Sequence, residues 1–303
     1  MADWSLSTIP PQEGKVILIT GGNSGLGYES ALALAQAGAT VIISARNEAK
    51  GQAALAAIRA AVPGARVELL ALNLADLASI RQAAETFRQR YTRLDVLMNN
   101  AGVMATPYQK TADGFEMQFG TNHLGHFALT GQLLDLLLNT PESRVVNVSS
   151  NLHTRGKMNF ADLHGAQRYD RWGAYCHSKL ANLLFTYELQ RKLSRYGAST
   201  IAVGAHPGYA ATNLQSGSSR LYSGLMWVAN KLFAQSAAAG ALSQIYAAAM
   251  PDVQGSDYIG PDGGMRGQPA KIQSSAASYD EADAARLWEI SVAATGVDFA
   301  PLP

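Results

Sequence analysis

Short apolar runs alternate along the chain with longer helical stretches, and this alternation predicts the fold. The first run, Lys15–Thr20, is apolar and β-branched between its ends, as expected of a strand buried on both faces of a parallel sheet. The stretch Tyr28–Ala37 is alanine-rich, predicts a helix, and is stopped by Gly38. Further strands are expected at Thr40–Ser44, Arg66–Ala71, Leu94–Met98, Arg144–Ser149, Ser199–Ala205 and near Asp257–Ile259, and further helices at Asn47–Ala60, Asp76–Tyr91, about Gly114–Leu138, from Gly173 onward, and at Asp280–Ala293.

Strands that alternate with helices in this way predict an α/β fold, a Rossmann-like doubly wound parallel sheet of about seven strands flanked by helices. Such a sheet binds its ligand at the carboxyl ends of the strands. The chain has 303 residues, of which 48% are hydrophobic, and this is ordinary for a single domain spanning residues 1–303.

A glycine-rich turn joins the first predicted strand to the first predicted helix. In this position backbone N–H groups and the helix dipole point at an anion, and glycine lets the backbone approach it closely. The turn therefore predicts a dinucleotide phosphate site, and the alternative is a merely tight connection between strand and helix. The residues expected to contact the cofactor here are Gly21, Asn23, Ser24, Gly25, Leu26 and Gly27.

The residue after the second strand discriminates between dinucleotides. An acidic residue there binds the ribose 2′-hydroxyl, whereas an arginine accommodates a 2′-phosphate. This chain has Arg46 in that position and no carboxylate until Glu48. We therefore expect NADP(H) to be preferred over NAD(H); the alternative is that Arg46 is a surface residue at a helix start.

Tyr175 and Lys179 are four residues apart in a predicted helix, so their side chains share one helix face. A fixed ammonium beside a phenol favours the ionised form and lowers the pKa of the tyrosine. The pair therefore suits a proton donor and acceptor near neutral pH. Alone, this spacing is weak evidence, because an amphipathic helix that carries an extended surface lysine accounts for it more often.

The motifs together resemble the classical short-chain dehydrogenase/reductase family. Ala174–Asn182 and Tyr258–Gly263 are similar to the branch of retinol dehydrogenases and WW-domain oxidoreductases and to its protochlorophyllide reductase relatives. The motifs, in chain order, are Thr20-Gly21-x-x-x-Gly25-x-Gly27, Asn99-Asn100-Ala101-Gly102, Asn122 in Thr-Asn-His-Leu-Gly, Ser149-Ser150, Tyr175-x-x-x-Lys179 and His206-Pro207-Gly208.

The resemblance implies a catalytic tetrad. Tyr175 would be the general acid or base, and Lys179 would lower its pKa and hold the nicotinamide ribose. Ser150 would bind the substrate oxygen, and Asn122 would hold a water that relays protons to Lys179. Ser150 is preferred to Ser149 because that branch uses the second serine, and neighbours on an extended strand point to opposite sides. Further cofactor contacts implied by the family are Asn100, Ala101, Gly102, Pro207, Gly208 and Thr212.

Two departures from the family pattern bear on the site. The stretch Asn151–Ala174 is longer than in the shortest members, contains the aromatic residues Phe160, Tyr169 and Trp172, and is interpreted as a substrate-side loop. The pair Asn73-Leu74 stands where an acidic residue often meets the adenine amino group. An amide oxygen still accepts that hydrogen bond.

An apolar segment at about residues 213–235 matches the family's substrate lid. With the aromatic loop, it predicts a small apolar alcohol or carbonyl compound as substrate. Ordinary core packing, a membrane contact or a subunit contact explains the same apolar residues equally well.

Composition narrows the class of partner. Lys and Arg number 24 and Asp and Glu 23, with no basic stripe, which argues against nucleic acid. The one cysteine, Cys176, is interpreted as packing, and a single cysteine fits a reducing, cytoplasmic setting. No signal peptide and no transmembrane run are expected. Homo-oligomerisation is compatible with the family.

Four histidines and one aspartate are further candidates for a metal site or a catalytic role. His123 and His126 have a spacing that can bind metal, but no third ligand is evident, so no metal site is predicted. His153 and His177 flank the expected catalytic segments, and a surface position is the default for both. Asp95, inside a strand-like run, is interpreted as structural.

The full motif set predicts an NADP(H)-dependent oxidoreductase that interconverts an apolar alcohol and its carbonyl by hydride transfer. A non-catalytic NADP(H)-binding sensor or scaffold is the alternative, and the presence of both Tyr175 and Lys179 counts against it. A light-dependent reductase ranks lower, because its relatives usually carry more cysteines near the site.

Overall fold

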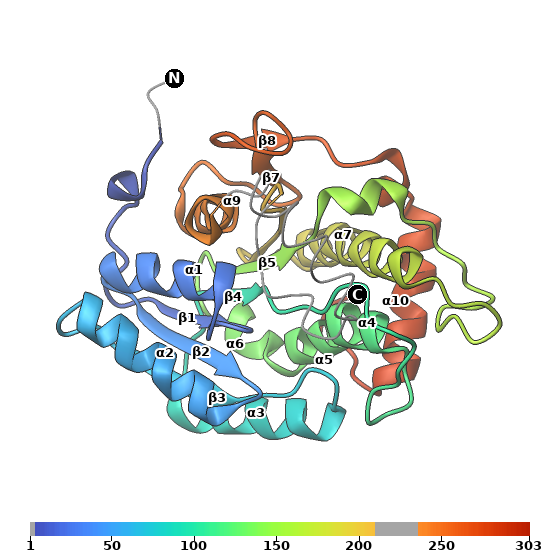
Figure 1. The fold of residues 1–303 in the computed structure, drawn as a ribbon, viewed down its shortest axis with the longest axis horizontal. Helices are drawn as coiled ribbons and strands as arrows, with labels where there is room; N and C mark the ends of the chain where they lie inside the picture. Colours follow the sequence, from blue (N-terminus) through green and yellow to red (C-terminus); the bar gives the residue numbers. More distant parts are fainter. Residues whose placement is uncertain (1–3, 210–235) are drawn as a thin grey trace, which may run out of the picture.

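The computed structural model describes residues 4–209 and 236–303, which are built around one eight-stranded sheet (Figure 1). The strand order is β3-β2-β1-β4-β5-β6-β7-β8, with β1 to β7 parallel and β8 antiparallel to β7. The predicted doubly wound α/β sheet is thus confirmed. Its strands are β1 (Val16–Ile19), β2 (Thr40–Ala45), β3 (Val67–Ala71), β4 (Val96–Asn99), β5 (Arg144–Val148), β6 (Ile201–Ala205), β7 (Tyr258–Pro261) and β8 (Pro269–Ile272).

Helices cover both faces of this sheet. The longer ones are α1 (Gly25–Gln36), α2 (Glu48–Ala61), α3 (Leu77–Arg90), α5 (Gly125–Gln132), α7 (Arg171–Tyr196), α9 (Ala237–Ala249) and α10 (Glu281–Thr295). The short ones are α4 (Met117–Phe119), α6 (Leu134–Leu138), the 3-10 turns η1 (Leu6–Thr8), η3 (Asn151–Arg155) and η5 (Ala276–Tyr279), and the π-helical turn η2 (Gly120–Leu124). No helix within the described ranges is both long enough and apolar enough to span a membrane.

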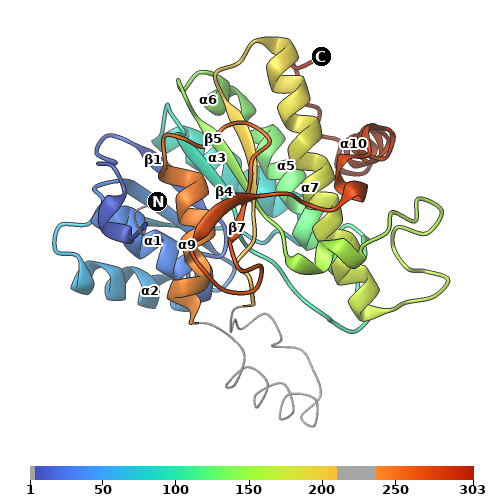
Figure 2. The same ribbon diagram turned by 90° about the horizontal axis from the view of Figure 1, so that it is seen from above.

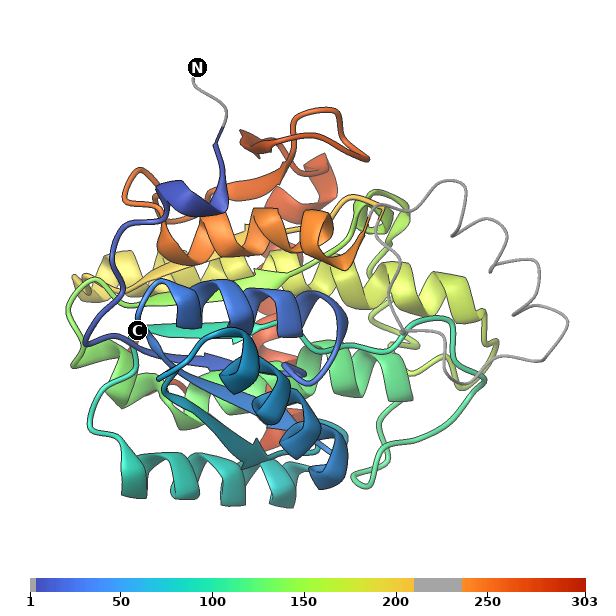
Figure 3. The same ribbon diagram turned by 60° about the vertical axis from the view of Figure 1, so that its left-hand side comes forward.

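The period-two alternation of β1 separates the two halves of the core. Ile17 and Ile19 point into the cluster formed with α1, α2 and α9, and Leu18 points into the cluster formed with α3, α5 and α7. All three side chains are fully buried. Figure 3 shows α1 and α9 side by side on the first face, and Figure 2 shows α10 against the outer side of α7.

A buried carboxylate links β1 to the residues just before β4, at the amino ends of these strands. Asp95, which precedes β4, accepts the backbone N–H of Val16 at 2.9 Å and forms a two-point ion pair with Arg93. The structural interpretation of Asp95 therefore agrees with its contacts.

The strand order reverses between β1 and β4, and this opens a crevice at the carboxyl ends of the two strands.

Three elements differ from the sequence expectation. The helix expected at about Gly114–Leu138 begins at Met117 and is interrupted by η2, because Gly120 and Gly125 allow close contacts there. A Cβ at Gly125 would lie 2.4 Å from the Leu74 carbonyl oxygen. Helix α9 was not predicted, and β8 was missed because this four-residue edge strand begins with proline and ends the sheet.

Helix α7 begins at a capped end, and this end carries Tyr175. Asp170 is the N-cap, and its carboxylate accepts the N–H groups of Trp172 at 3.2 Å and Gly173 at 2.9 Å. These are amides that have no partner within the helix.

Asp170→Ala removes the cap, so we expect the free energy of unfolding to fall by about 1 kcal/mol. This corresponds to a Tm lower by about 2–4 °C in thermal unfolding. Asp170→Asn keeps one acceptor oxygen and is the matched control, with a smaller loss expected. A Tm of Asp170→Ala equal to that of the wild type would show that the cap contributes nothing.

Candidate active site

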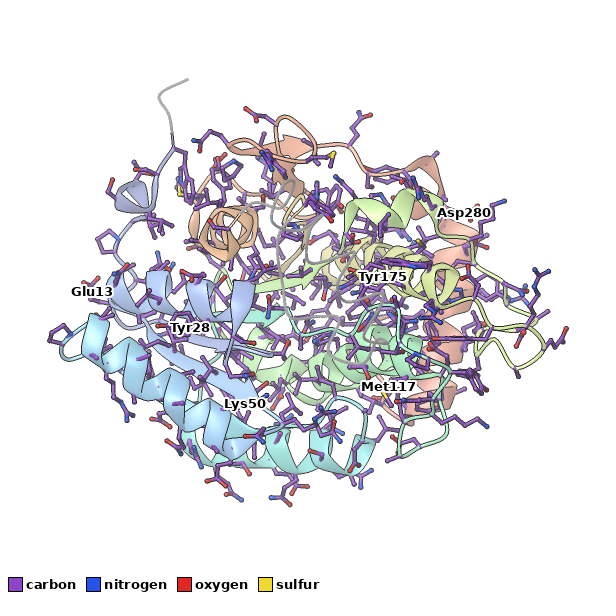
Figure 4. All side chains as sticks on the ribbon, viewed as in Figure 1. Glu13, Tyr28, Lys50, Met117, Tyr175 and Asp280 are labelled. Carbon is purple, nitrogen blue, oxygen red and sulfur yellow. The ribbon has the colours of Figure 1, made fainter. Side chains whose placement is uncertain are left out.

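A cavity of about 220 Å³ lies at the carboxyl ends of β1, β4, β5 and β6. It brings the glycine turn and the Tyr175/Lys179 pair into one space, and Tyr175 is labelled on α7 in Figure 4. Its walls are formed by Gly21, Asn23, Ser24, Gly25, Leu26, Gly27, Asn100, Ala101, Gly102, Val103, Val148, Ser149, Tyr175, Lys179 and Pro207.

The glycine turn forms one wall, and its conformation requires glycine. Gly21 and Gly25 have φ angles of +66° and +55°, which side chains disfavour. A Cβ at Gly27 would lie 2.5 Å from the Gly21 oxygen and 2.6 Å from the Asn100 amide nitrogen. Ser24, the N-cap of α1, makes no side-chain cap bond, so it leaves the first amides of α1 open to an anion. This wall fits a dinucleotide pyrophosphate.

The second strand is tied to the same turn. The N–H of Gly22 donates to the Ser44 carbonyl oxygen at 3.2 Å, and the N–H of Gly21 donates to the Ser44 hydroxyl at 3.3 Å. Arg46 follows Ser44 by two residues and is exposed. The guanidinium is therefore carried by a strand end that is anchored to the glycine turn, although Arg46 is not part of the cavity wall.

Thr20 fixes the opposite wall. Its hydroxyl oxygen accepts the N–H groups of Asn100 and Ala101, both at 2.9 Å, and its carbonyl accepts the Asn100 side-chain amide at 2.7 Å. The Gln244 amide, from α9, donates to Asn100 Oδ1 at 3.0 Å. The role of Gln244 was missed; a glutamine inside an alanine-rich helix was the available signal.

His126 links Thr20 to Asn122. Its Nδ1 lies 2.9 Å from the Asn122 carbonyl oxygen, which can only accept, so Nδ1 carries the proton. Its Nε2 therefore accepts the Thr20 hydroxyl proton at 2.9 Å. Burial lowers the pKa of His126 to about 4, so the ring is neutral near neutral pH. His126 thus connects the glycine wall with the turn that carries Asn122.

Tyr175 and Lys179 are both buried, and burial sets their pKa values. Burial raises the pKa of Tyr175 to about 12, and a hydrogen bond with Ser150 opposes this in part. Burial lowers the pKa of Lys179 to about 8. The pKa of Tyr175 is therefore shifted in the direction opposite to the expected one, because burial outweighs the nearby lysine. The Lys179 Nζ lies 5.8 Å from the ring centroid and donates to the Val148 carbonyl at 2.9 Å.

The two serines after β5 have different partners. Ser149 lines the cavity, but its hydroxyl donates to the Lys179 carbonyl at 2.8 Å and shares a hydrogen bond with Tyr258. The Ser150 hydroxyl forms a hydrogen bond with Tyr175 and accepts the Leu152 N–H at 3.2 Å. The serine that meets the phenol of Tyr175 is therefore Ser150.

Asn122 lies in the π-helical turn η2, fully buried. Its side chain accepts the Val103 N–H at 2.8 Å and donates to the Val103 carbonyl at 2.9 Å and to the Ser178 hydroxyl at 2.9 Å. A Cβ at Gly102 would meet both Asn122 Oδ1, at 3.2 Å, and Lys179 Nζ, at 3.6 Å. Asn122 therefore lies close to Lys179, and its relay of protons through a water stays a prediction.

Asn73, Leu74 and Gly208 were also expected to contact the cofactor, but they do not line the cavity. The Asn73 side-chain oxygen already accepts the Ala75 N–H at 3.3 Å, and the Leu74 side chain packs in the core, so Leu74 offers only its backbone. Pro207 lines the cavity, whereas Gly208 follows it at φ +67° outside the wall. Thr212 and the expected lid at 213–235 lie outside the described residues.

Two aromatic residues of the Asn151–Ala174 loop serve the loop itself. The Tyr169 hydroxyl bonds to the Glu116 carboxylate at 2.9 Å, and Phe160 packs with α4 and α10 under the Arg286 guanidinium. Neither lines the cavity. Both rings therefore anchor the loop to neighbouring elements and do not form an apolar wall of this cavity.

The histidines beside the catalytic segments are buried, so the default surface position was wrong for His153 and His177, which are 2% and 8% exposed. His123 contacts the Ser291 hydroxyl at 2.9 Å, and His126 belongs to the chain described above. Within residues 4–209 and 236–303, no three His, Cys, Asp or Glu side chains come together in a way that could hold a metal ion.

Comparison with known proteins agrees with this geometry. The sequence model of the family described as short chain dehydrogenase matches residues 15–221. Mouse retinol dehydrogenase 12 is 42% identical over 287 residues, which cover 94% of this chain and 88% of the relative. Mouse retinol dehydrogenase 14 is 40% identical over 300 residues, which cover 94% and 86%.

A solved structure shares the architecture over nearly the whole length. The crystal structure of an uncharacterised protein from Mycobacterium paratuberculosis superposes with a TM-score of 0.83 at 41% identity, covering 98% of this chain and 99% of the other. The resemblance expected from the motifs is thereby confirmed. The chain belongs to the short-chain dehydrogenase family, in its retinol dehydrogenase-like branch, and is an NAD(P)-dependent oxidoreductase.

Proposed function

We propose that this protein is an NADP(H)-dependent oxidoreductase that interconverts an apolar alcohol and its carbonyl compound, with Tyr175 as the general acid and base. The observation that carries the proposal is the cavity in which Tyr175 and Lys179 share a space with the glycine turn. A proton donor thus lies beside a cradle that fits a dinucleotide.

The bound nicotinamide would supply the hydride in carbonyl reduction or accept it in alcohol oxidation. In reduction the Tyr175 hydroxyl gives its proton to the substrate oxygen, and in oxidation its phenolate takes that proton back. Ser150 donates a hydrogen bond to the same oxygen and stabilises its developing charge. The Lys179 ammonium, held by the Val148 carbonyl, favours the phenolate that remains after proton transfer.

The preference for NADP(H) rests on Arg46. Its guanidinium is exposed at the end of β2, and that strand end is hydrogen-bonded to the glycine turn. A ribose 2′-phosphate beside this turn would form charge-assisted hydrogen bonds with it. A 27% identical short chain dehydrogenase structure from Escherichia coli, with a TM-score of 0.52, is described as complexed with NADPH.

The proposed substrate class is an apolar alcohol or carbonyl compound. The cavity that contains Tyr175 is also lined by the apolar residues Ala101, Val103 and Val148. The similar proteins are named retinol dehydrogenases, and retinol is an apolar alcohol. These two observations support an apolar substrate independently of the aromatic loop.

Tyr175→Phe removes the transferable proton and keeps the ring, so turnover of an apolar aldehyde with NADPH should fall by at least about 100-fold. The dissociation constant for NADPH, measured by fluorescence titration, should change little. Tyr108→Phe, at an exposed tyrosine, is the matched control. Unchanged turnover in Tyr175→Phe would rule out the proposed proton donor.

Arg46→Asp replaces the proposed phosphate contact with a repelling charge. We expect the affinity for NADPH to fall by about tenfold or more while that for NADH is kept or improves. Arg81→Asp makes the same charge change at an exposed site on α3 and should leave the ratio of the two affinities as it is. An equal loss for both cofactors would mean that Arg46 does not contact the 2′-phosphate.

Lys179→Met should inactivate the enzyme and yet stabilise the fold near neutral pH. The buried ammonium has a pKa of about 8, so at about pH 7 the wild type bears the desolvation cost of a charge that methionine lacks. We expect the free energy of unfolding of the variant to be higher by about 2 kcal/mol in urea denaturation.

The pH dependence of this difference has a definite sign. Above about pH 8 the folded protein releases the Lys179 proton while the unfolded chain still binds it, so wild-type stability rises with pH relative to the variant. The difference in free energy of unfolding between Lys179→Met and the wild type should therefore become smaller as the pH rises to about 10. Lys50→Met, at an exposed lysine of α2 (Figure 4), is the control. If the difference in free energy of unfolding does not change with pH, the Lys179 ammonium is not buried as described.

A further inference from the structure

The turn that carries Ser150 is held by a histidine within the same turn. The His153 backbone N–H and ring Nδ1 both approach the Ser150 carbonyl oxygen, at 3.0 Å and 2.7 Å. The ring is 2% exposed and packs edge-on against Tyr258, with centroids 5.5 Å apart. The Ser150 carbonyl thus accepts two hydrogen bonds from His153. These bonds fix the backbone of the residue whose hydroxyl lies beside Tyr175.

The second nitrogen of His153 reaches a distant part of the chain. Its Nε2 accepts the backbone N–H of Ser275 at 3.0 Å. Because a carbonyl oxygen can only accept and a backbone N–H can only donate, the ring has one tautomer that satisfies both contacts, with the proton on Nδ1. His153 therefore bridges the Ser150 carbonyl and the Ser275 amide without a free choice of orientation.

The C-terminal segment Tyr258–Tyr279 makes three further contacts with the same turn. The Tyr258 hydroxyl forms a hydrogen bond with Ser149 and lies 3.4 Å from the His153 Nδ1, and the Asn151 amide donates to the Gly264 carbonyl at 2.6 Å. The family match ends at residue 221, so all of these anchors come from chain beyond the part that matches the general family. The serine turn is thus fastened to a part of the chain outside that match.

We propose that His153 is a positioning residue through which the C-terminal segment Tyr258–Tyr279 fixes the catalytic orientation of Ser150. The proposal rests on the role given to Ser150 in the proposed function. The ring holds the backbone of the turn, the turn holds the Ser150 hydroxyl against Tyr175, and the Ser275 amide holds the ring. Loosening any link widens the range of serine orientations and lowers the rate of chemistry more than cofactor binding.

A double-mutant cycle separates this role from general packing. His153→Phe keeps the aromatic contact with Tyr258. It removes the ring hydrogen bonds to the Ser150 carbonyl and the Ser275 amide, and with them the 3.4 Å contact of Nδ1 with the Tyr258 hydroxyl. In the otherwise wild-type enzyme we expect kcat for an apolar aldehyde with NADPH to fall by about tenfold, with the NADPH dissociation constant unchanged within about twofold. In the Ser150→Ala enzyme the same substitution should change kcat by less than about twofold, because the group that it positions is gone.

A second pair of variants tests the link from the other side. Ser275 has φ −68°, which proline adopts, so Ser275→Pro removes the N–H donor to His153. Because the proline ring Cδ takes the place of that hydrogen, the His153 ring must also move away from its present position. Ser275→Ala keeps the N–H and removes a hydroxyl that has no hydrogen-bond partner among the described residues. We expect Ser275→Pro to lower kcat by severalfold relative to Ser275→Ala, and to do so only when Ser150 is present.

The outcomes discriminate between the two proposals. A His153→Phe loss that is equally large in the Ser150→Ala enzyme, or no loss at all, overturns the positioning role while leaving the proposed function intact. Full activity of Ser150→Ala itself instead removes the role of this serine in the proposed function. If His153→Phe does not fold, the comparison of Ser275→Pro with Ser275→Ala decides, and equal kcat values for these two contradict the proposal.

Discussion

The site depends on keeping one ammonium group out of water. The side chain of Lys179 is 4% exposed, and among the described residues its Nζ has the Val148 carbonyl as its hydrogen-bond acceptor. Burying a cation with a single neutral acceptor costs free energy, and proteins keep such groups where chemistry needs them. Burial of the Lys179 ammonium lowers the stability of the fold, and the apolar side chains buried on both faces of the central strands offset this loss.

Several elements converge to place this cation. β5 supplies the carbonyl that holds it, α7 supplies the lysine and Tyr175 on one helix face, and the loops after β1 and β4 supply the walls. A chain of hydrogen bonds from Thr20 through His126 to Asn122 joins the cofactor wall to the catalytic side. Buried side chains therefore connect the glycine turn to the turn that carries Asn122, beside the acid–base pair.

Much of this could be predicted from the sequence, because it depends on local pattern. The strand runs, the glycine turn and the four-residue spacing of Tyr175 and Lys179 are properties of neighbouring residues, and the structure brings them together as the parallel topology requires. The choice of Ser150 over Ser149 came from the family resemblance and is compatible with the partners of the two hydroxyls. Alternation along an extended strand says only that the two side chains point to opposite sides.

What could not be predicted depends on contacts distant in sequence. Gln244 reaches Asn100 across 144 residues, and His153 reaches Ser275 across 122, so the partner of each side chain cannot be predicted from its neighbours in the sequence. The direction of the Tyr175 pKa was misjudged for a related reason. Helical spacing shows that a lysine is near, but the degree of burial that outweighs it comes from packing of the whole fold.

Measuring the pKa of the Lys179 ammonium shows whether this group is buried in the folded protein. In protein labelled with carbon-13 at lysine Cε, the Lys179 resonance is identified by its disappearance in Lys179→Met and then followed through a pH titration. A midpoint near pH 8 is predicted, because burial penalises the charged form. A midpoint at the ordinary lysine value would mean that the ammonium is solvated, and the central role given to its burial would be wrong.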